Sequence, residues 1–231
     1  MRNRNWIGGF GVVIAVALAA GRAVSQDKHA EPHKGGDQKP GAAMKMPSPD
    51  EIKKMMEEAA ALAKPGEHHE ALEAMAGKWD VTMKMYMGPS MPPIESKATA
   101  EKKWILGGRY LEFTIQGELL MPDPKSKMGM AKKAYEGRGV LGYDNFRNLY
   151  VGDWASNIST ALLTYSGQMD PSGKVLTTYG TMDEPMMKVV GRLVKHVTTI
   201  ESKDKHTFVV YDLHAGPDYK VFEWVFTRQG E

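Results

Sequence analysis

The stretch Gly77-Lys78-Trp79-Asp80-Val81-Thr82-Met83-Lys84-Met85-Tyr86-Met87 carries the clearest structural signal in the chain. Apolar residues occupy every second position from Trp79 to Met87, and mostly polar residues lie between them. This period of two is typical of a β-strand with one buried face. Gly88-Pro89 and Pro92-Pro93 follow and predict the end of the strand, because proline cannot donate to a strand ladder.

C-terminal to this strand, short segments of the same kind recur at regular spacing, with no helical pattern between them. The predicted strands span residues 95–105, 109–116, 137–143, 149–155, 161–169, 174–181, 188–200, 206–213 and 219–228. About ten short strands joined by turns favour an antiparallel barrel or sandwich, and closure into a barrel is the usual way to remove exposed sheet edges. We therefore expect a mainly β domain over residues 77–231.

N-terminal to the first strand, residues 48–76 predict two short helices. Ser48-Pro49-Asp50-Glu51 is a capping box with proline in the first turn, and Pro65-Gly66 predicts the end of the first helix. Its apolar residues from Ile52 to Leu62 fall on one face, which we expect to pack on the outside of the sheet or at the barrel mouth. The second helix is predicted over residues 67–76.

The first 25 residues have the features of a secretory signal peptide. Arg2 and Arg4 precede an apolar run over residues 7–20, and small residues allow cleavage after Ser25. Residues 26–47 form a polar linker, in which His29 and His33 have metal-ligand spacing but no reason to be helical. We expect a secreted or periplasmic protein without a transmembrane span after cleavage; retention as an N-terminal anchor is the alternative.

Composition excludes several classes of protein. The chain has no cysteine, so disulfides, thiolate nucleophiles and thiolate metal sites are absent. The formal net charge of +2 comes from 30 basic and 28 acidic residues, and three of the basic residues are Arg2, Arg4 and Arg22 of the signal segment. The remaining 27 basic residues against 28 acidic ones leave a charge of −1, which does not favour a nucleic-acid partner.

An ordered set of short motifs resembles a known family. The motifs are His69-x-x-Leu72, Gly77-x-Trp79, Gly107-Gly108, Gly142-Tyr143-Asp144 and Phe226-Thr227-Arg228. Together they resemble the uncharacterised bacterial domain-of-unknown-function family 1579 (DUF1579) over residues 67–228. The resemblance implies a lipocalin-like antiparallel barrel and brings no established catalytic residue. It also implies barrel closure by a cation–π contact between Trp79 and Arg228, the alternative being a core tryptophan with an exposed arginine.

Two segments carry patterns that are also found at functional sites. Residues 137–142 match G-x-G-x-x-G, but another strand follows instead of a helix, so the glycines are better explained by barrel curvature. Residues 118–136 are too long for a hairpin turn and carry four lysines. We expect them to form either a lid over the barrel mouth or a flexible loop.

The candidate ligand-binding residues lie on the predicted strands. Tyr143, Trp154, Tyr165 and Tyr211, like Trp224, supply aromatic bulk that either fills the core or contacts a ligand. Arg192 and His196 share one strand face. If that face points inward they could anchor a carboxylate or another polar group, whereas the usual exposure of both residue types favours the outward alternative.

Methionine-rich segments offer a further alternative. Met44-x-Met46, Met83-x-Met85-x-Met87 and Met128-x-Met130 have spacings that suit Cu(I), which thioether ligands select. Met83, Met85 and Met87, however, continue the apolar face that begins at Trp79, so core filling explains them better. We predict no metal and no cofactor.

These observations favour binding of a small apolar or amphipathic ligand in the barrel, without catalysis. An enzyme that uses Arg192, His196 and Tyr143 at the barrel mouth is the first alternative. An envelope interaction module with a filled core is the second. The sequence names neither the ligand nor the oligomeric state.

Overall fold

The computed structural model describes residues 46–230, except 89–90, 124, 127–128 and 185–187; from residue 47 onward they belong to the compact unit Pro47–Glu231. The signal segment, the linker and the Met44-x-Met46 and Met128-x-Met130 pairs lie wholly or partly outside these residues. The helical elements are α1 (Pro49–Leu62), α2 (Glu67–Glu70) and a 3₁₀ turn, η1 (Glu73–Met75). The strands are β1 (Gly77–Met85), β2 (Ile94–Ile105), β3 (Tyr110–Pro122), β4 (Met130–Asp144), β5 (Leu149–Ser156), β6 (Leu163–Met169), β7 (Val175–Glu184), β8 (Val189–Ser202), β9 (Lys205–Asp212) and β10 (Lys220–Arg228).

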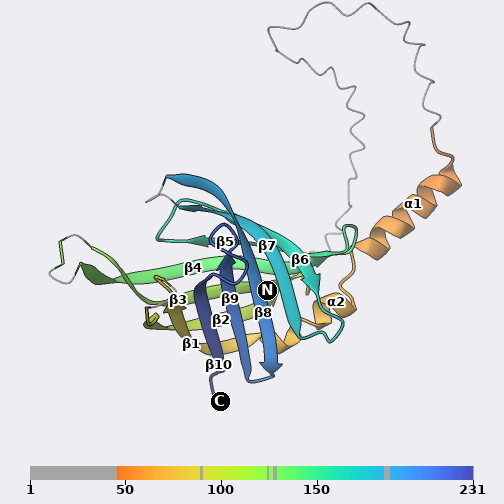
Figure 1. Cartoon of the computed structure of the whole chain (residues 1–231). Coiled ribbons are helices and arrows are strands. Elements are labelled where there is room, and N and C mark those ends of the chain that lie inside the picture. Colours follow the sequence, from red (N-terminus) through yellow and green to blue (C-terminus); the bar gives the residue numbers. More distant parts are fainter. Residues whose placement is uncertain (1–45, 89–90, 124, 127–128, 185–187, 231) are drawn as a thin grey trace, which may run out of the picture. The chain divides into compact units, whose positions relative to one another are not determined.

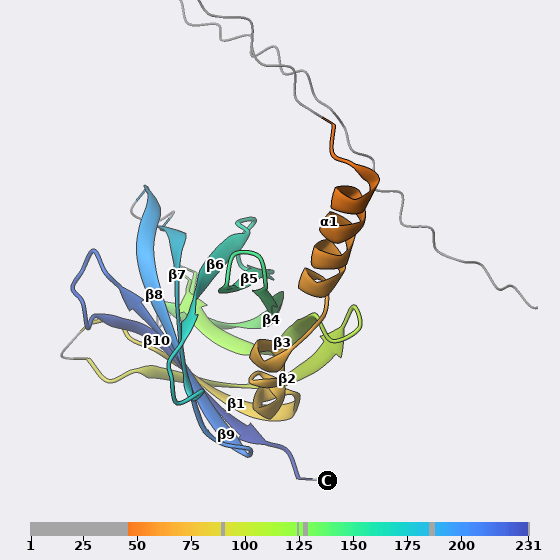
Figure 2. The ribbon, with the colours of Figure 1, turned by 90° about the vertical axis from the view of Figure 1, so that its right-hand side faces the viewer.

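The ten strands form a closed antiparallel barrel in which each strand pairs with its neighbours in sequence and β10 closes against β1 (Figure 1). Figure 2 shows the ring of strands, with α2 beside the start of β1. Closure gives every strand a hydrogen-bonded neighbour on both sides over at least part of its length, so the barrel has no first or last strand. The fold class predicted from the sequence is confirmed.

Alternation within the strands separates the core from the outer face. Trp79, Val81 and Met83 of β1 are buried, and their partners on β10 are Arg228, Phe226 and Trp224. Because directly opposed residues lie on the same face of a sheet, this register carries the inward face around the barrel. Met83 is thus a core residue, as core filling predicts, whereas Met87 lies beyond the end of β1 and is 49% exposed, so core filling is wrong for Met87.

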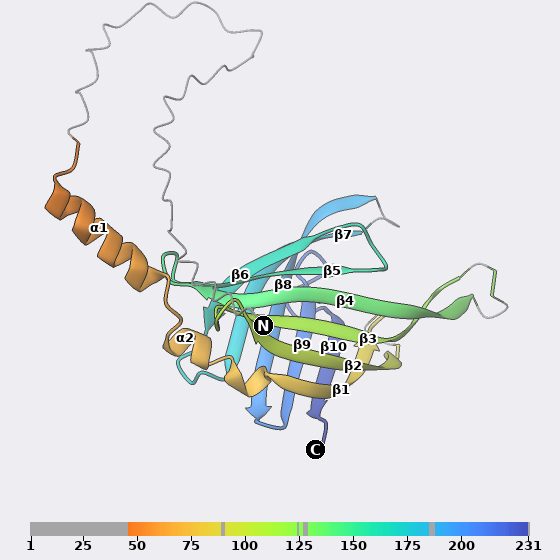
Figure 3. The ribbon, with the colours of Figure 1, turned by 180° about the vertical axis from the view of Figure 1, so that it is seen from behind.

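Residues 118–136 are mostly strand, so the predicted lid or flexible loop is wrong. The β3–β4 ladder continues from Glu118 opposite Ala134 to Pro122 opposite Met130, and the connection is confined to residues 123–129. Figure 3 shows the two strands as one long hairpin. Lys132 and Lys133 interrupt the apolar alternation of β4, and Lys132 Nζ lies 3.1 Å from the Glu118 carboxylate across the ladder.

The prediction that the apolar face of α1 packs against the sheet is also wrong. No residue of α1 is buried, and Met55 is 59% exposed. Its capping box is present as predicted, and Asn145 donates hydrogen bonds of 2.8 Å to the carbonyl oxygens of Leu62 and Lys64. No described helix is long and apolar enough to cross a membrane.

The single second helix predicted over residues 67–76 is instead divided into α2 and η1. Leu72 and Met75 of this segment are fully buried. Because these two residues supply the apolar contacts with the barrel, the helical segment that enters the core is this one and not α1.

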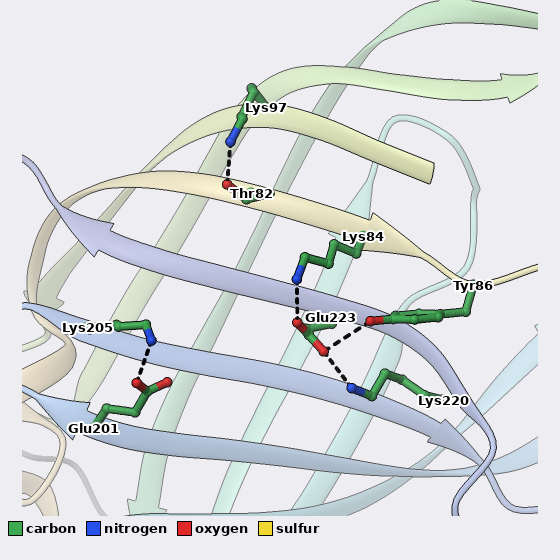
Figure 4. A network of polar contacts seen from close by, with 8 residues as sticks. All are labelled: Thr82, Lys84, Tyr86, Lys97, Glu201, Lys205, Lys220 and Glu223. Atoms are coloured by element: carbon green, nitrogen blue, oxygen red, sulfur yellow. Dashed lines mark hydrogen bonds and ion pairs between the residues drawn. The ribbon is translucent and has the colours of Figure 1, made fainter. Parts of the chain in front are cut away.

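A cluster of charges on the outer face joins β1 to β10 (Figure 4). The Glu223 carboxylate lies 3.0 Å from Lys84 Nζ and 2.5 Å from Lys220 Nζ, and it accepts a hydrogen bond of 3.2 Å from the Tyr86 hydroxyl. Partial burial opposes ionisation of Glu223, but the two ammonium groups outweigh it and lower its pKa to about 2.

Candidate functional site

One end of the barrel is closed by the segment that precedes β1. Leu72 and Met75 are fully buried there against the inward residues Leu111, Tyr150, Leu176 and Ile200. The Trp79 indole N–H donates to the carbonyl oxygen of Met75 at 3.0 Å. This end of the barrel is therefore packed, and we call it the closed end; the opposite end, at which β8 begins, is called the open end.

Trp79 and Arg228 are in contact at the closed end, as the family resemblance implies. The guanidinium carbon of Arg228 lies 4.2 Å from the centroid of the Trp79 ring. Arg228 also donates to the carbonyl oxygens of Ala76 at 2.8 Å, Ala74 at 3.0 Å and Lys203 at 2.7 Å. A Cβ at Gly77, whose φ is +122°, would collide with this guanidinium, so glycine is required at the head of β1.

Four inward rings form an aromatic wall, defined here as Phe113, Trp154, Phe208 and Trp224. Phe113 and Trp154 lie 4.9 Å apart, Trp154 and Trp224 5.9 Å, and Phe208 and Trp224 5.7 Å between ring centroids. All four remain only partly buried although they point into the barrel. Partial exposure of rings that face inward indicates that side chains do not completely fill the interior beside the aromatic wall.

Tyr165 also lies on the inner surface, where a glycine makes room for its ring. A Cβ on Gly152 of the neighbouring strand would lie 2.5 Å from the Tyr165 ring. The Tyr165 hydroxyl donates to the carbonyl oxygen of Val140 at 3.3 Å, and burial raises the pKa of this phenol. The ring is thus held against the barrel wall, with its polar atom satisfied by the backbone.

Arg192 and His196 face inward, so the outward alternative is wrong. His196 is 8% exposed, its Nδ1 lies 3.4 Å from the Thr178 hydroxyl, and its ring packs edge-on against Tyr165. Burial lowers the pKa of His196 to about 4, so the imidazole is neutral at pH 7. The two residues place polar atoms inside the barrel.

Arg192 is satisfied within the protein by an ion pair with Asp212 of β9. Burial opposes ionisation of Asp212, yet the Arg192 guanidinium and the His214 backbone N–H hold its pKa below the ordinary value. The pair lies where β8 begins and β9 ends, which is the open end of the barrel. The open end of the barrel thus carries an ion pair whose two charges neutralise each other.

Tyr143 and Tyr211 do not lie beside the aromatic wall. Tyr143 stacks on His68 of α2 at 4.1 Å and contacts Tyr150, so it belongs to the closed end. Tyr211 lies between the inward residues Val210 and Asp212, and Lys195 Nζ lies 4.5 Å above its ring on the outer face. The alternation of β9 therefore turns Tyr211 away from the interior.

The proposed enzyme site of Arg192, His196 and Tyr143 is not assembled. β4 and β8 run in the same direction, Tyr143 lies near the end of β4, and Arg192 lies near the start of β8. The two residues consequently lie at opposite ends of the barrel. Among the described residues no group of three His, Asp or Glu side chains could hold a metal ion.

A polar pair that the sequence analysis did not identify lies near the closed end. Lys102 of β2 and His206 of β9 are 8% and 1% exposed, and Lys102 Nζ lies 2.7 Å from His206 Nε2. The signal for Lys102 was its position on the apolar face Ala98-x-Ala100-x-Lys102-x-Trp104. Nothing in the sequence relates it to His206, because the two strands are brought together only by barrel closure.

Comparison with solved structures gives matches of low sequence identity. A redesigned beta barrel is 15% identical, with 69% of this chain and 96% of that chain covered and a TM-score of 0.35. The S-type phycobiliprotein lyase CPES from Guillardia theta is 10% identical, with 72% and 99% covered and a TM-score of 0.41. Comparison with curated proteins gives no match.

The family model described as "Protein of unknown function (DUF1579)" matches residues 64–228, which include α2, η1 and all ten strands. The matched segment thus contains the closed end with Trp79 and Arg228 and the whole aromatic wall. The chain belongs to the DUF1579 family.

Proposed function

We propose that the barrel binds one small apolar or amphipathic molecule against the aromatic wall. The observation that carries this proposal is the partial exposure of Phe113, Trp154, Phe208 and Trp224, all of which point inward. Ligand sites of this kind are concave and mostly aromatic or aliphatic, with few polar groups. A filled core, as an interaction module requires, would bury these rings.

The polar groups of the interior favour an amphipathic ligand. His196 and Thr178 lie on neighbouring strands partway along the barrel, and the Arg192–Asp212 pair lies nearer the open end. A ligand that lies along the aromatic wall has neutral hydrogen-bonding groups beside it and a charged pair at the entrance. We propose that these groups serve as hydrogen-bonding partners of the ligand and that the site binds without catalysis.

The environmentally sensitive probe N-phenyl-1-naphthylamine tests the proposal, because its fluorescence rises on transfer from water to an apolar site. We expect saturable binding and quenching of tryptophan emission. Trp224→Ala should weaken binding about twofold to tenfold, since an aromatic contact is worth about 0.5–1.5 kcal/mol. Tyr179→Ala, which removes an outward ring on β7 that is 47% exposed, is the matched control. Absence of saturable binding by the folded protein would reject the proposal.

We further propose that the protein is exported and that residues 1–25 are removed. The supports are the basic start, the apolar run and the small residues before Gln26. Expression of the full chain in a diderm bacterium, followed by fractionation and N-terminal sequencing, tests this. A mature protein that starts at Gln26 in the periplasm or medium is expected, whereas an intact N-terminus in the membrane fraction would identify an anchor.

A further inference from the structure

The environment of Lys102 is unusual for a lysine side chain. Its Nζ lies 4.1 Å from the centroid of the Phe226 ring and 4.8 Å from that of Phe113, one of the four rings of the aromatic wall. The third neighbour is His206, whose Nε2 is 2.7 Å away. The amine thus lies at the inner end of the aromatic wall, among rings and not in water.

Lys102 has no acidic partner among the described residues, in contrast to Arg192 and to the lysines at Glu223. The titratable or charged groups around it are His206 of β9 and, beyond His206, Arg228 of β10. Neither carries a negative charge. Burial without a counterion lowers the pKa of Lys102 to about 7, so a large share of the amine is uncharged at neutral pH.

His206 is fixed in place beside this amine. Its ring stacks on Phe226 at 4.3 Å with an interplanar angle of 8° and meets Trp79 edge-on at 4.3 Å. Its Nδ1 is buried without a hydrogen-bond partner among the described residues, so Nε2 is the only ring nitrogen engaged. When Nε2 accepts one hydrogen of the neutral amine, the amine lone pair is directed away from His206.

We propose that Lys102 is a covalent attachment site, at which an apolar aldehyde held against the aromatic wall forms an imine with the Nζ amine. This inference rests on the proposed binding function and names the ligand class. An uncharged lysine in an apolar pocket is the form that attacks carbonyl carbon. His206 acts as a positioning residue.

The reaction balances without a further reactant. The nitrogen lone pair forms a bond to the carbonyl carbon, and the electrons of the C=O π bond move to oxygen. One amine hydrogen passes to that oxygen as a proton, which gives a carbinolamine. The C–O bond then breaks, the second amine hydrogen leaves with the oxygen as water, and the nitrogen lone pair forms the C=N bond.

The experiment traps the imine on the unaltered chain. The protein is incubated with decanal and sodium cyanoborohydride at pH 7, which reduces any imine to a stable secondary amine, and modified peptides are mapped by mass spectrometry. At a pKa of about 7 half of the Lys102 amines are neutral, against roughly one in 2,500 for a lysine with the reference pKa. We expect Lys102 to be labelled at least tenfold faster than Lys97, which lies exposed on the outer face of the same strand.

Lys102→Met should abolish this fast labelling, whereas Lys97→Met should leave it unchanged. Acetaldehyde, which cannot occupy the aromatic wall, should show at least tenfold less selectivity for Lys102. Labelling of Lys102 no faster than Lys97 would overturn the inference. If the naphthylamine probe still binds in that case, the proposed function stands and only the covalent site fails; if the probe does not bind either, both fail.

Discussion

Replacement of Lys102 by methionine should stabilise the protein at neutral pH, although it removes a buried hydrogen bond. Lys102 is 8% exposed, and burial lowers its pKa from 10.5 to about 7. The unfolded chain therefore binds more protons than the folded one between pH 7 and pH 10.5, so the folding stability of the unaltered chain rises with pH through this window. Below pH 7 the cost of burying the amine is present in full.

The magnitude follows from these values. At 1.36 kcal/mol per pH unit, lowering the pKa from 10.5 to about 7 corresponds to about 5 kcal/mol of unfolding free energy. The variant leaves His206 Nε2 without its partner at 2.7 Å, and an unsatisfied buried polar group costs about 1–3 kcal/mol. We expect Lys102→Met to be about 2–4 kcal/mol more stable at pH 7 and about 1–3 kcal/mol less stable at pH 10.5.

Urea denaturation followed by tryptophan fluorescence at pH 6, 7, 8, 9 and 10 measures this difference. Lys97→Met is the matched control, because its amine lies on the outer face and donates to the Thr82 hydroxyl at 2.6 Å; its difference from the unaltered chain should stay within about 0.5 kcal/mol. A stability difference for Lys102→Met that does not change with pH would refute the reasoning. So would a Lys102→Met variant that is less stable than the unaltered chain at pH 6.

Three further predictions concern stability. Arg228→Ala removes the contact with Trp79 and three hydrogen bonds to backbone carbonyls, and should cost about 2–4 kcal/mol in chemical denaturation; Arg228→Lys should recover less than half of it, because one ammonium group cannot reach all three. Glu223 has a folded pKa of about 2 against an ordinary 4.5, so its contribution to the free energy of unfolding is present above pH 4.5 and is lost as pH falls towards 2. Glu223→Gln should therefore lower the free energy of unfolding by about 1–2 kcal/mol at pH 7 but by almost nothing at pH 2. A variant whose stability falls with acid as steeply as that of the unaltered chain would contradict this. Gly152→Ala places a methyl group 2.5 Å from the Tyr165 ring and should lower stability by about 1–3 kcal/mol, measured by thermal denaturation against Gly66→Ala, which has open space around it.

Local patterns predicted the strands because a half-buried strand shows its period in its own residues. The segment 77–87 is the clearest example, and β1 occupies Gly77–Met85. The prediction of a lid or flexible loop for residues 118–136 was wrong because these strands lack a simple apolar alternation. Their backbone nevertheless pairs along the β3–β4 ladder. The prediction that the apolar face of α1 packs against the barrel was wrong because the pattern of an amphipathic helix does not specify which surface, if any, covers that face.

The direction of Arg192 and His196 could not be settled from β8 alone. Both faces of that strand mix polar and apolar residues, with Arg192, Val194 and His196 on one face and Leu193 and Lys195 on the other. Local hydrophobicity therefore does not decide which face is inward. The pairing with β9 decides which face is inward, because the Asp212 carboxylate forms an ion pair with the Arg192 guanidinium inside the barrel.

The sequence by itself predicted about ten short antiparallel strands and their order, and the family resemblance of its motifs implied the closed barrel and the contact of Trp79 with Arg228. Those features depend on residues near one another in the chain or on motifs of fixed order. Only the tertiary structure decided that Lys102 meets His206, 104 positions away, beneath the aromatic wall. The ionisation of a buried amine depends on what lies across the barrel from it, and closure of the sheet determines those neighbours.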